Sequence, residues 1–185
     1  WVMGEACRQA VAWQRAGLPP LSIAVNLSAV QFKRSDVTQV VSRALQESGL
    51  DPGLLELELT ESILIQHVEG VLSTLQSLKR LGVTLSIDDF GTGYSSLSYL
   101  KRFDIDKLKI DQSFVRDLAS DPDDAAIVRA IIQMAHSLSL KTIAEGVETA
   151  SALQMLNDFQ CDEAQGFHFS QPMPADEFAR YVKQR

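Results

Sequence analysis

The sequence predicts an α/β fold in which parallel strands alternate with helices. Two observations support this class: short apolar runs alternate with segments of helical spacing, and six of these runs carry a polar residue at their end. The six polar residues are Asn26, Glu58, Asp88, Lys109, Glu145 and Gln165. Because parallel strands of a barrel open their carboxyl ends on one face, we expect these side chains to meet in one pocket.

The N-terminal part is predicted to contain two helices and two strands. Apolar residues recur at three- and four-residue spacing over 1–17 and 29–48, and a glycine ends each stretch. The short apolar runs 21–25 and 54–59 have the length and composition of buried strands. Asn26 and Glu58 therefore stand near the carboxyl ends of these two strands.

The middle of the chain is predicted to hold two strands, a helix before them and a loop between them. The helix covers 68–82, the strands cover 83–87 and 105–110, the loop covers 90–94, and a short helix passes through Leu97 and Leu100. Asp88 and Asp89 directly follow the first of these strands. Adjacent carboxylates repel each other unless a cation lies beside them, so the pair is a candidate metal site. The alternative is that Asp88-Asp89 begins a turn before Gly91.

The C-terminal part is predicted to continue the alternation. A helix over 123–138 has Asp123 and Asp124 in its first turn, where acidic side chains suit the helix dipole. Further along are a strand over 141–144, a helix capped by Thr149, a weak strand over 161–164 and a last helix over 174–184. Six strand–helix units are two fewer than a complete eight-stranded TIM-like (β/α) barrel contains. We therefore expect an incomplete barrel of one domain, 1–185, that lacks its first strands.

Composition restricts the function classes. The chain has 185 residues, 45% of them hydrophobic and 22% charged, with a net charge of −7, which argues against a nucleic-acid polymer as partner. Cys7 and Cys161 are expected to be reduced and buried. The sequence contains neither a secretory signal nor an apolar run near the roughly 20 residues that span a bilayer. A cytoplasmic domain without a membrane segment is the expectation.

The predicted pocket combines three carboxylates, two carboxamides and a lysine. Oxygen ligands of this kind suit hard divalent cations, and the lysine suits an anionic substrate. Metal-assisted chemistry on an anionic substrate is therefore expected. Alternatives for single residues are that Lys109 pairs with Asp106 or Asp111, and that Glu145 caps the following helix. The three histidines have no metal-ligand spacing and are expected to be ordinary surface or helix residues.

Six short motifs, taken in order and spacing, resemble the EAL domain family. They are Val25-Asn26-Leu27-Ser28, Glu58-Leu59-Thr60-Glu61-Ser62, Asp88-Asp89-Phe90-Gly91-Thr92-Gly93-Tyr94-Ser95-Ser96, Lys109-Ile110-Asp111, Ala144-Glu145-Gly146-Val147-Glu148 and Gln165-Gly166-Phe167. The resemblance implies a bacterial phosphodiesterase that hydrolyses cyclic di-GMP to linear pGpG with Mg²⁺ or Mn²⁺. It also implies a homodimer and an upstream sensory or GGDEF-type (diguanylate cyclase-like) domain.

The resemblance also implies roles for individual residues. Asn26, Glu58, Asp88 and Asp89 correspond to metal ligands. Lys109, Glu145 and Gln165 correspond to catalytic residues, with Lys109 at the phosphate or the attacking water, Glu145 as general base and Gln165 supporting the water or the second metal. Glu148 and Asp111 correspond to substrate-binding residues, although Glu148 could equally be a solvated acid. Glu61 corresponds to an anchor for the glycine-containing loop after Asp89.

One family motif is missing. The Glu-Ala-Leu motif supplies a metal-ligand glutamate in the family, and Glu5-Ala6-Cys7 lies inside a predicted helix, after the place where that motif belongs. We expect an N-terminally truncated domain rather than a degenerate one, because the other motifs are intact. The isolated 185-residue chain is then expected to have little or no activity.

Two rival functions remain open at this point. The first is a catalytically inactive receptor that binds cyclic di-GMP and signals through a partner. The second is a barrel lyase or aldolase that uses Lys109 as a Schiff-base amine. Nearby aspartates, Asp106 and Asp111, would favour the charged ammonium and so oppose the second function.

Overall fold

Six parallel strands form the centre of the computed structural model, which describes residues 1–34, 36–61, 63, 68–91, 100 and 102–184. The strands are β1 (Ile23–Leu27), β2 (Leu55–Thr60), β3 (Thr84–Phe90), β4 (Lys107–Ile110), β5 (Lys141–Ala144) and β6 (Glu163–Ala164). They pair in chain order, and every pairing is parallel. The predicted α/β class and the alternation of elements are confirmed.

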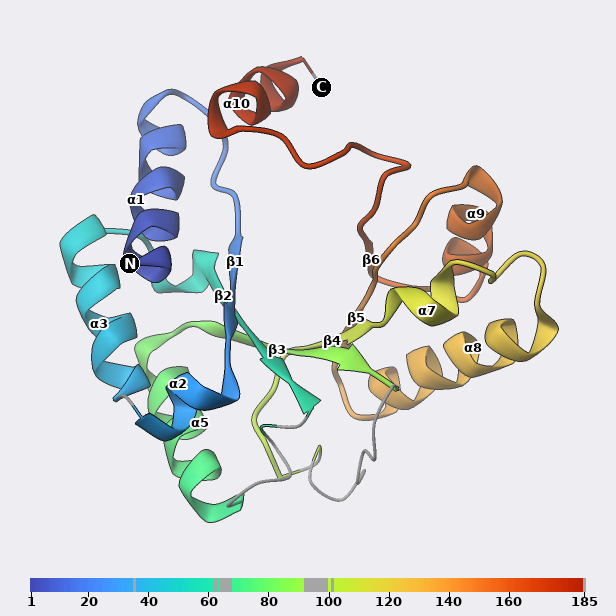
Figure 1. Ribbon diagram of the computed structural model, residues 1–185, viewed down its shortest axis with the longest axis horizontal. Helices are drawn as coiled ribbons and strands as arrows, with labels where there is room; N and C mark the ends of the chain where they lie inside the picture. The colour runs from blue at the N-terminus through green and yellow to red at the C-terminus, as the bar shows by residue number, and fades with distance from the viewer. Residues whose placement is uncertain (35, 62, 64–67, 92–99, 101, 185) are drawn as a thin grey trace.

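The helices form an outer layer around the strands (Figure 1). They are α1 (Val2–Arg15), α2 (Ala29–Arg34), α3 (Val37–Ser48), α5 (Val68–Leu81), α7 (Gln112–Val115), α8 (Pro122–Ser137), α9 (Ala150–Asp158) and α10 (Ala175–Lys183), with a 3₁₀ turn η1 (Pro52–Leu54) before β2. Within the described ranges, every helix is too short or too polar to cross a lipid bilayer.

Strand β2 shows how the fold separates its core from its site. Leu55, Leu57 and Leu59 are fully buried, while the alternating Glu56 and Glu58 are also buried but point to the opposite face. Burial of each leucine side chain contributes about 1.5–3 kcal/mol relative to exposure. The leucines therefore hold β2 against the helix layer, and the same pleat directs the glutamates into the barrel interior.

The sheet is an incomplete TIM-like barrel. Strands β1 and β6 form its two edges and do not pair with each other among the described residues. Near this opening, α10 lies beside α1 (Figure 1). The indole Nε1 of Trp13 donates to the carbonyl of Ala175 at 3.2 Å, and its ring packs 4.7 Å from that of Phe178. These contacts tie the last helix to the first.

The prediction of one helix over 29–48 is wrong, because a cap divides it. The Asp36 side chain accepts a hydrogen bond from Gln39 N at 3.0 Å and begins α3, separate from α2. A capping carboxylate satisfies a backbone donor that has no partner within the helix, so it favours a new helix start. Gly49 then ends α3 in the left-handed conformation, as predicted.

Three other expectations need correction or fall outside the described residues. Strand β3 does not end at Ile87 but continues through both aspartates to Phe90. Cys7 is buried as expected, whereas Cys161 is only half-buried, and both are free thiols. Of the predicted helix through Leu97 and Leu100, only Leu100 lies within the described residues, and it is helical and buried.

Candidate active site

Lys109 is the centre of an ionic cluster at the carboxyl ends of the strands. Its Nζ lies 2.7 Å from Glu58 Oε1, 2.8 Å from Asp88 Oδ1 and 2.7 Å from Glu145 Oε1. These side chains come from β4, β2, β3 and the residue after β5, so the barrel brings distant segments together. The carboxamide of Asn26 joins the cluster by donating from Nδ2 to Glu58 Oε2 at 2.9 Å.

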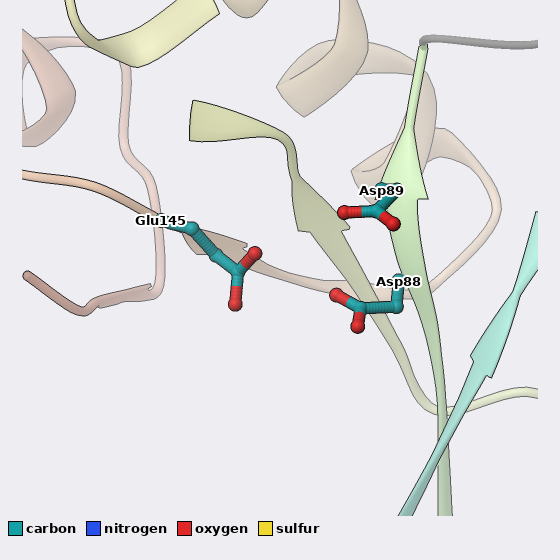
Figure 2. Close-up of side chains that lie close together, drawn as sticks. All are labelled: Asp88, Asp89 and Glu145. Atoms are coloured by element: carbon teal, nitrogen blue, oxygen red, sulfur yellow. The ribbon is translucent and has the colours of Figure 1, made fainter. Parts of the chain in front are cut away.

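A break in the regular pleat turns both aspartates of β3 toward the site. Adjacent residues of a regular strand point to opposite faces. Here the β3–β4 register shifts between Ile87 and Phe90, and Asp89 adopts a φ of 55°. Figure 2 shows the carboxyl groups of Asp88 and Asp89 both directed toward Glu145. The bulge therefore places two consecutive carboxylates on the same side of β3, which the periodicity of the sequence could not predict.

The three carboxyl groups of Asp88, Asp89 and Glu145 are close enough to share a cation. Each offers an oxygen, and these oxygens all lie within 4.8 Å of one another. Hard divalent cations such as Mg²⁺ and Mn²⁺ prefer oxygen ligands, so the donor set fits them. This grouping adds Glu145, assigned from sequence only as a base, to the residues that could hold a metal.

Burial and ion pairing shift the pKa of Lys109 in opposite directions, and they do the same for the pKa of Glu145. Burial alone would lower the pKa of Lys109, but hydrogen bonds to Asp88, Glu145 and Glu58 outweigh burial and raise the pKa well above its usual value. Burial raises the pKa of Glu145, and the ammonium of Lys109 offsets only part of that rise. Lys109 is therefore charged, and Glu145 is a stronger proton acceptor than an exposed glutamate.

Asp111 lies beside Asp89 and has a local structural contact as well. Burial raises the pKa of Asp89, and the charges of Asp88 and Asp111 raise it further. Asp111 shows the opposite shift: burial alone would raise its pKa, but hydrogen bonds from Ser113 and Asp89 lower it. The Asp111 side chain also caps α7 by accepting from Ser113 N at 2.9 Å. The hydrogen bond between the two carboxyl groups contributes to both shifts, because it raises the pKa of Asp89 and lowers that of Asp111.

A pocket of about 240 Å³ opens beside Glu145. It is lined by Gln112, Glu145, Gly146, Glu148, Gln165, Gly166 and Phe167. Gln165 is placed by its backbone, since Gln165 N donates to Ala144 O at 2.8 Å and Gln165 O accepts from Val147 N at 3.0 Å. Both Glu148 and Gln165 are exposed to this space.

Glu61 is buried near the start of the segment after β2. Neither of its carboxylate oxygens has a hydrogen-bond partner among the described residues. Buried carboxylates are normally hydrogen-bonded. The loop it is predicted to anchor runs through 92–99, outside the described residues, so that role stays a prediction. Gly91 does require glycine, because its φ is 103° and a Cβ would lie 2.9 Å from Phe114.

The structure gives Asp106, the cap of α9 and Asp88-Asp89 other roles than the alternatives considered from sequence. Asp106 binds Lys79 Nζ at 2.6 Å and Leu85 N at 2.8 Å rather than Lys109. The cap of α9 is Thr149, which accepts from Ala152 N, and not Glu145. Asp88-Asp89 lies in a strand and does not begin a turn.

The histidines described by the structure make ordinary contacts. His136 is hydrogen-bonded to Asp162 at 2.9 Å, and His168 packs edge-on against Phe169. His67 lies outside the described residues. Neither described histidine belongs to the acidic group around Glu145.

Sequence reasoning missed two sets of residues near the site. Gln112, the first residue of α7, and Phe167, in the turn after β6, line the pocket beside Glu145, and neither position carries a periodic signal. Glu56 and Lys107 form an ion pair of 3.0 Å one layer below the cluster. Their position two residues before Glu58 and Lys109 was the available signal, because residues i and i+2 of a strand share a face.

Comparison with known proteins agrees with this geometry. The profile of the EAL domain family matches residues 1–172. The signaling protein YkoW of Bacillus subtilis is 47% identical over 182 residues, covering 98% of this chain and 23% of that protein. The bifunctional diguanylate cyclase/cyclic di-GMP phosphodiesterase MucR of Pseudomonas aeruginosa is 48% identical over 182 residues. The match covers 98% of this chain and 27% of that protein. The chain thus spans about a quarter of the length of these relatives.

Solved structures share the fold. The MucR phosphodiesterase in complex with cyclic di-GMP superposes with a TM-score of 0.92 at 47% identity, covering 96% of this chain and 72% of that one. The EAL domain of Mycobacterium smegmatis DcpA gives a TM-score of 0.94 at 40% identity, covering 100% and 83%.

Proposed function

The chain belongs to the EAL domain family, and from this premise we propose that the full-length protein hydrolyses cyclic di-GMP to linear pGpG. The observation that carries the proposal is the convergence of Glu58, Asp88 and Glu145 on Lys109 within 2.8 Å. The similarity to MucR, a named cyclic di-GMP phosphodiesterase, supports the choice of substrate. The chain would be most of one domain of that protein.

Metal ions fit the donor set of the site. Asn26, Glu58 and Asp88 would hold one divalent cation, and Asp88 with Asp89 would hold a second. Mg²⁺ or Mn²⁺ would supply neutralisation of phosphate charge and activation of water. Glu145 lies within the same group of oxygens, which supports a role for it beside the reacting water.

The protein's own residues would then act on the phosphodiester. Glu145 accepts the proton of the attacking water, and its raised pKa suits a general base. As water attacks phosphorus, a phosphorus–oxygen bond of the ring breaks and the linear dinucleotide forms. The ammonium of Lys109 stabilises the negative charge that develops on the phosphate oxygens. Gln165, exposed in the adjacent pocket, hydrogen-bonds the water or the phosphate.

The pocket beside Glu145 suits one guanine base. Glu148 would accept hydrogen bonds from the guanine edge, and the exposed ring of Phe167 offers an apolar surface for stacking. Asp111 would contribute to the site by orienting Asp89, to which it is hydrogen-bonded. Glu61 would anchor the loop that follows Gly91, and its buried carboxylate, without a hydrogen-bond partner among the described residues, supports that role.

The test is turnover by the full-length protein. Purified protein is incubated with cyclic di-GMP and Mg²⁺ or Mn²⁺, and the products are separated by chromatography. We expect pGpG from the wild type and a loss of at least about 100-fold in the Glu145→Gln variant. Binding of cyclic di-GMP without any pGpG would favour the inactive receptor instead. The raised pKa of Lys109 opposes the Schiff-base alternative, because the ammonium is not a nucleophile.

A further inference from the structure

A second ionic layer lies below the cluster around Lys109, buried at Glu56 and open to solvent at Glu163 on the edge strand β6. Lys107 Nζ lies 3.0 Å from Glu56 Oε2 and 3.0 Å from Glu163 Oε1. The three residues come from β4, β2 and β6. Interior layers of (β/α) barrels are built from alternate strands in this way, but branched aliphatic side chains usually fill them. An ionic layer in this place is therefore unusual and calls for a role.

Each member of the lower layer stands two residues before a residue of the site. Glu56 precedes Glu58, Lys107 precedes Lys109, and Glu163 precedes Gln165. Residues i and i+2 of a strand share a face and are connected by a stiff backbone segment of roughly 6.6 Å. A contact that fixes β2, β4 and β6 relative to one another in the lower layer therefore also fixes Glu58 and Lys109, and it restricts Gln165, the residue directly after β6.

The ion pair between Glu56 and Lys107 is the principal constraint in this layer. The glutamate side chain is 6% exposed and that of the lysine 14%, so solvent screens their attraction only partly. Burial alone would lower the pKa of Lys107, but hydrogen bonds with Glu163 and Glu56 raise it, so the lysine is charged. The other oxygen of Glu56 has no hydrogen-bond partner among the described residues. The lysine thus determines where this carboxylate lies.

Strand β3 leaves room for the ion pair. It lies between β2 and β4, and Ser86 pairs in register with Lys107. Ser86 is fully buried, and its hydroxyl makes no hydrogen bond within the part of the chain that the structure describes. A small side chain at this position lets the charged groups of the neighbouring strands meet across β3.

We propose that Lys107 is a positioning residue that, through Glu56 and Glu163, sets the spacing of Glu58, Lys109 and Gln165 in the site above. This inference rests on the proposed function for its kinetic readout. Divalent-cation affinity gives a second readout that does not depend on turnover, because Glu58 is among the proposed ligands. Lys107 itself contacts neither substrate nor cation.

The test compares three variants of the full-length protein. Lys107→Met removes the charge at similar length. Glu56→Gln/Lys107→Met also removes the carboxylate that would otherwise be buried without a counter-charge. Lys141→Met is the matched control, because Lys141 pairs with Lys107 in the register of β4 and β5 but is exposed. For each protein we measure kcat and KM with cyclic di-GMP, Mn²⁺ affinity by calorimetric titration, and the thermal midpoint.

The expected result is a specific loss of turnover. Displaced catalytic groups reduce rates strongly, so kcat of Lys107→Met should fall about tenfold with KM within about twofold, and Mn²⁺ binding should weaken several-fold. The double variant should regain the thermal midpoint but keep the low kcat and weak Mn²⁺ binding. The control should match the wild type.

The inference is overturned if a folded double variant has wild-type kcat and Mn²⁺ affinity. It is also overturned if Lys141→Met loses as much as Lys107→Met. If Lys107→Met does not fold, the double variant decides. If the wild type yields no pGpG, the proposed function has failed, and the Mn²⁺ affinities of the variants alone decide on Lys107.

Discussion

The two ends of the barrel use carboxylates in opposite ways. At the amino end, Asp162 accepts hydrogen bonds from Thr142 N at 2.8 Å, Thr142 Oγ1 at 2.9 Å and His136. Asp106 likewise accepts hydrogen bonds from Lys79 Nζ and from the backbone N–H of Leu85. Asp162 and Asp106 therefore each have their own donors, and they share none of these donors with each other.

At the carboxyl end, several carboxylates depend on one cation. Glu58, Asp88 and Glu145 all contact the single ammonium of Lys109, and Asp89 lies beside them. Like charges at this spacing repel each other, so the cluster keeps an excess of negative charge that a divalent cation can neutralise. Asp162 and Asp106 stabilise the fold through donors of their own, whereas the cluster shares one ammonium among three acids and is left with charge that can bind a cation.

The largest expected effect is on turnover at the carboxyl end. Glu145→Gln keeps the shape of the side chain but removes its ability to accept a proton. We expect kcat to fall by about 10²–10⁴-fold, the range for loss of a general base. The thermal midpoint should stay within a few degrees of the wild type. A kcat within threefold of the wild type would remove Glu145 from the mechanism.

The next effect concerns stability at the same end. Lys109→Met leaves Glu58, Asp88 and Glu145 without their shared cation. We expect the free energy of unfolding in metal-free buffer to fall by about 3–5 kcal/mol, as for a buried ion pair that loses one partner. Added Mn²⁺ should recover part of this loss by binding the folded state. Denaturant unfolding with and without Mn²⁺ measures both; a free energy of unfolding of Lys109→Met in metal-free buffer equal to that of the exposed-lysine variant Lys141→Met would contradict the account.

At the amino end the expected effect is smaller and depends on pH. Burial alone would raise the pKa of Asp162, but hydrogen bonds from His136 and Thr142 lower it. A lowered pKa in the folded state gives stability that is present above the unfolded pKa and is lost as pH falls through the folded pKa. Asp162→Asn should lose about 1–2 kcal/mol at neutral pH and show less acid sensitivity. Unfolding curves from neutral to acidic pH test this, and kcat at low temperature should be unchanged.

The smallest effect is expected in the exposed pocket. Glu148→Gln retains size but replaces an acceptor-only group with an amide. We expect KM for cyclic di-GMP to rise about five- to tenfold, the equivalent of one typical hydrogen bond of about 1–1.4 kcal/mol, with kcat nearly unchanged. Steady-state kinetics decide this; a change in kcat alone would mean that Glu148 does not bind the base.

Much of this comparison could be predicted from sequence, because it follows from strand periodicity. Apolar runs locate the strands, and parallel strands bring Asn26, Glu58 and Lys109 to one end. The hydrogen-bond donors of each carboxylate could not be predicted, since the partners of Asp106 and Asp162 come from other strands and helices. The bulge that turns Asp89 toward Asp88 leaves no periodic signal either.

The predicted boundaries of one helix were wrong for a related reason. The split of the predicted helix over 29–48 depends on a single side chain, Asp36, whose capping bond competes with continuous apolar spacing. The ion pair between Glu56 and Lys107 was also not foreseen, although both residues lie in predicted strands. A sequence shows that two charged residues face the interior, but not which strand supplies the partner.

Calorimetric titration of Mn²⁺ into the full-length protein most directly tests whether the carboxyl-end acids jointly bind cations. The account predicts saturable binding by the wild type and by Asp162→Asn, and a loss of at least about tenfold in affinity for Asp88→Asn. Equal Mn²⁺ affinity in all three proteins would contradict it.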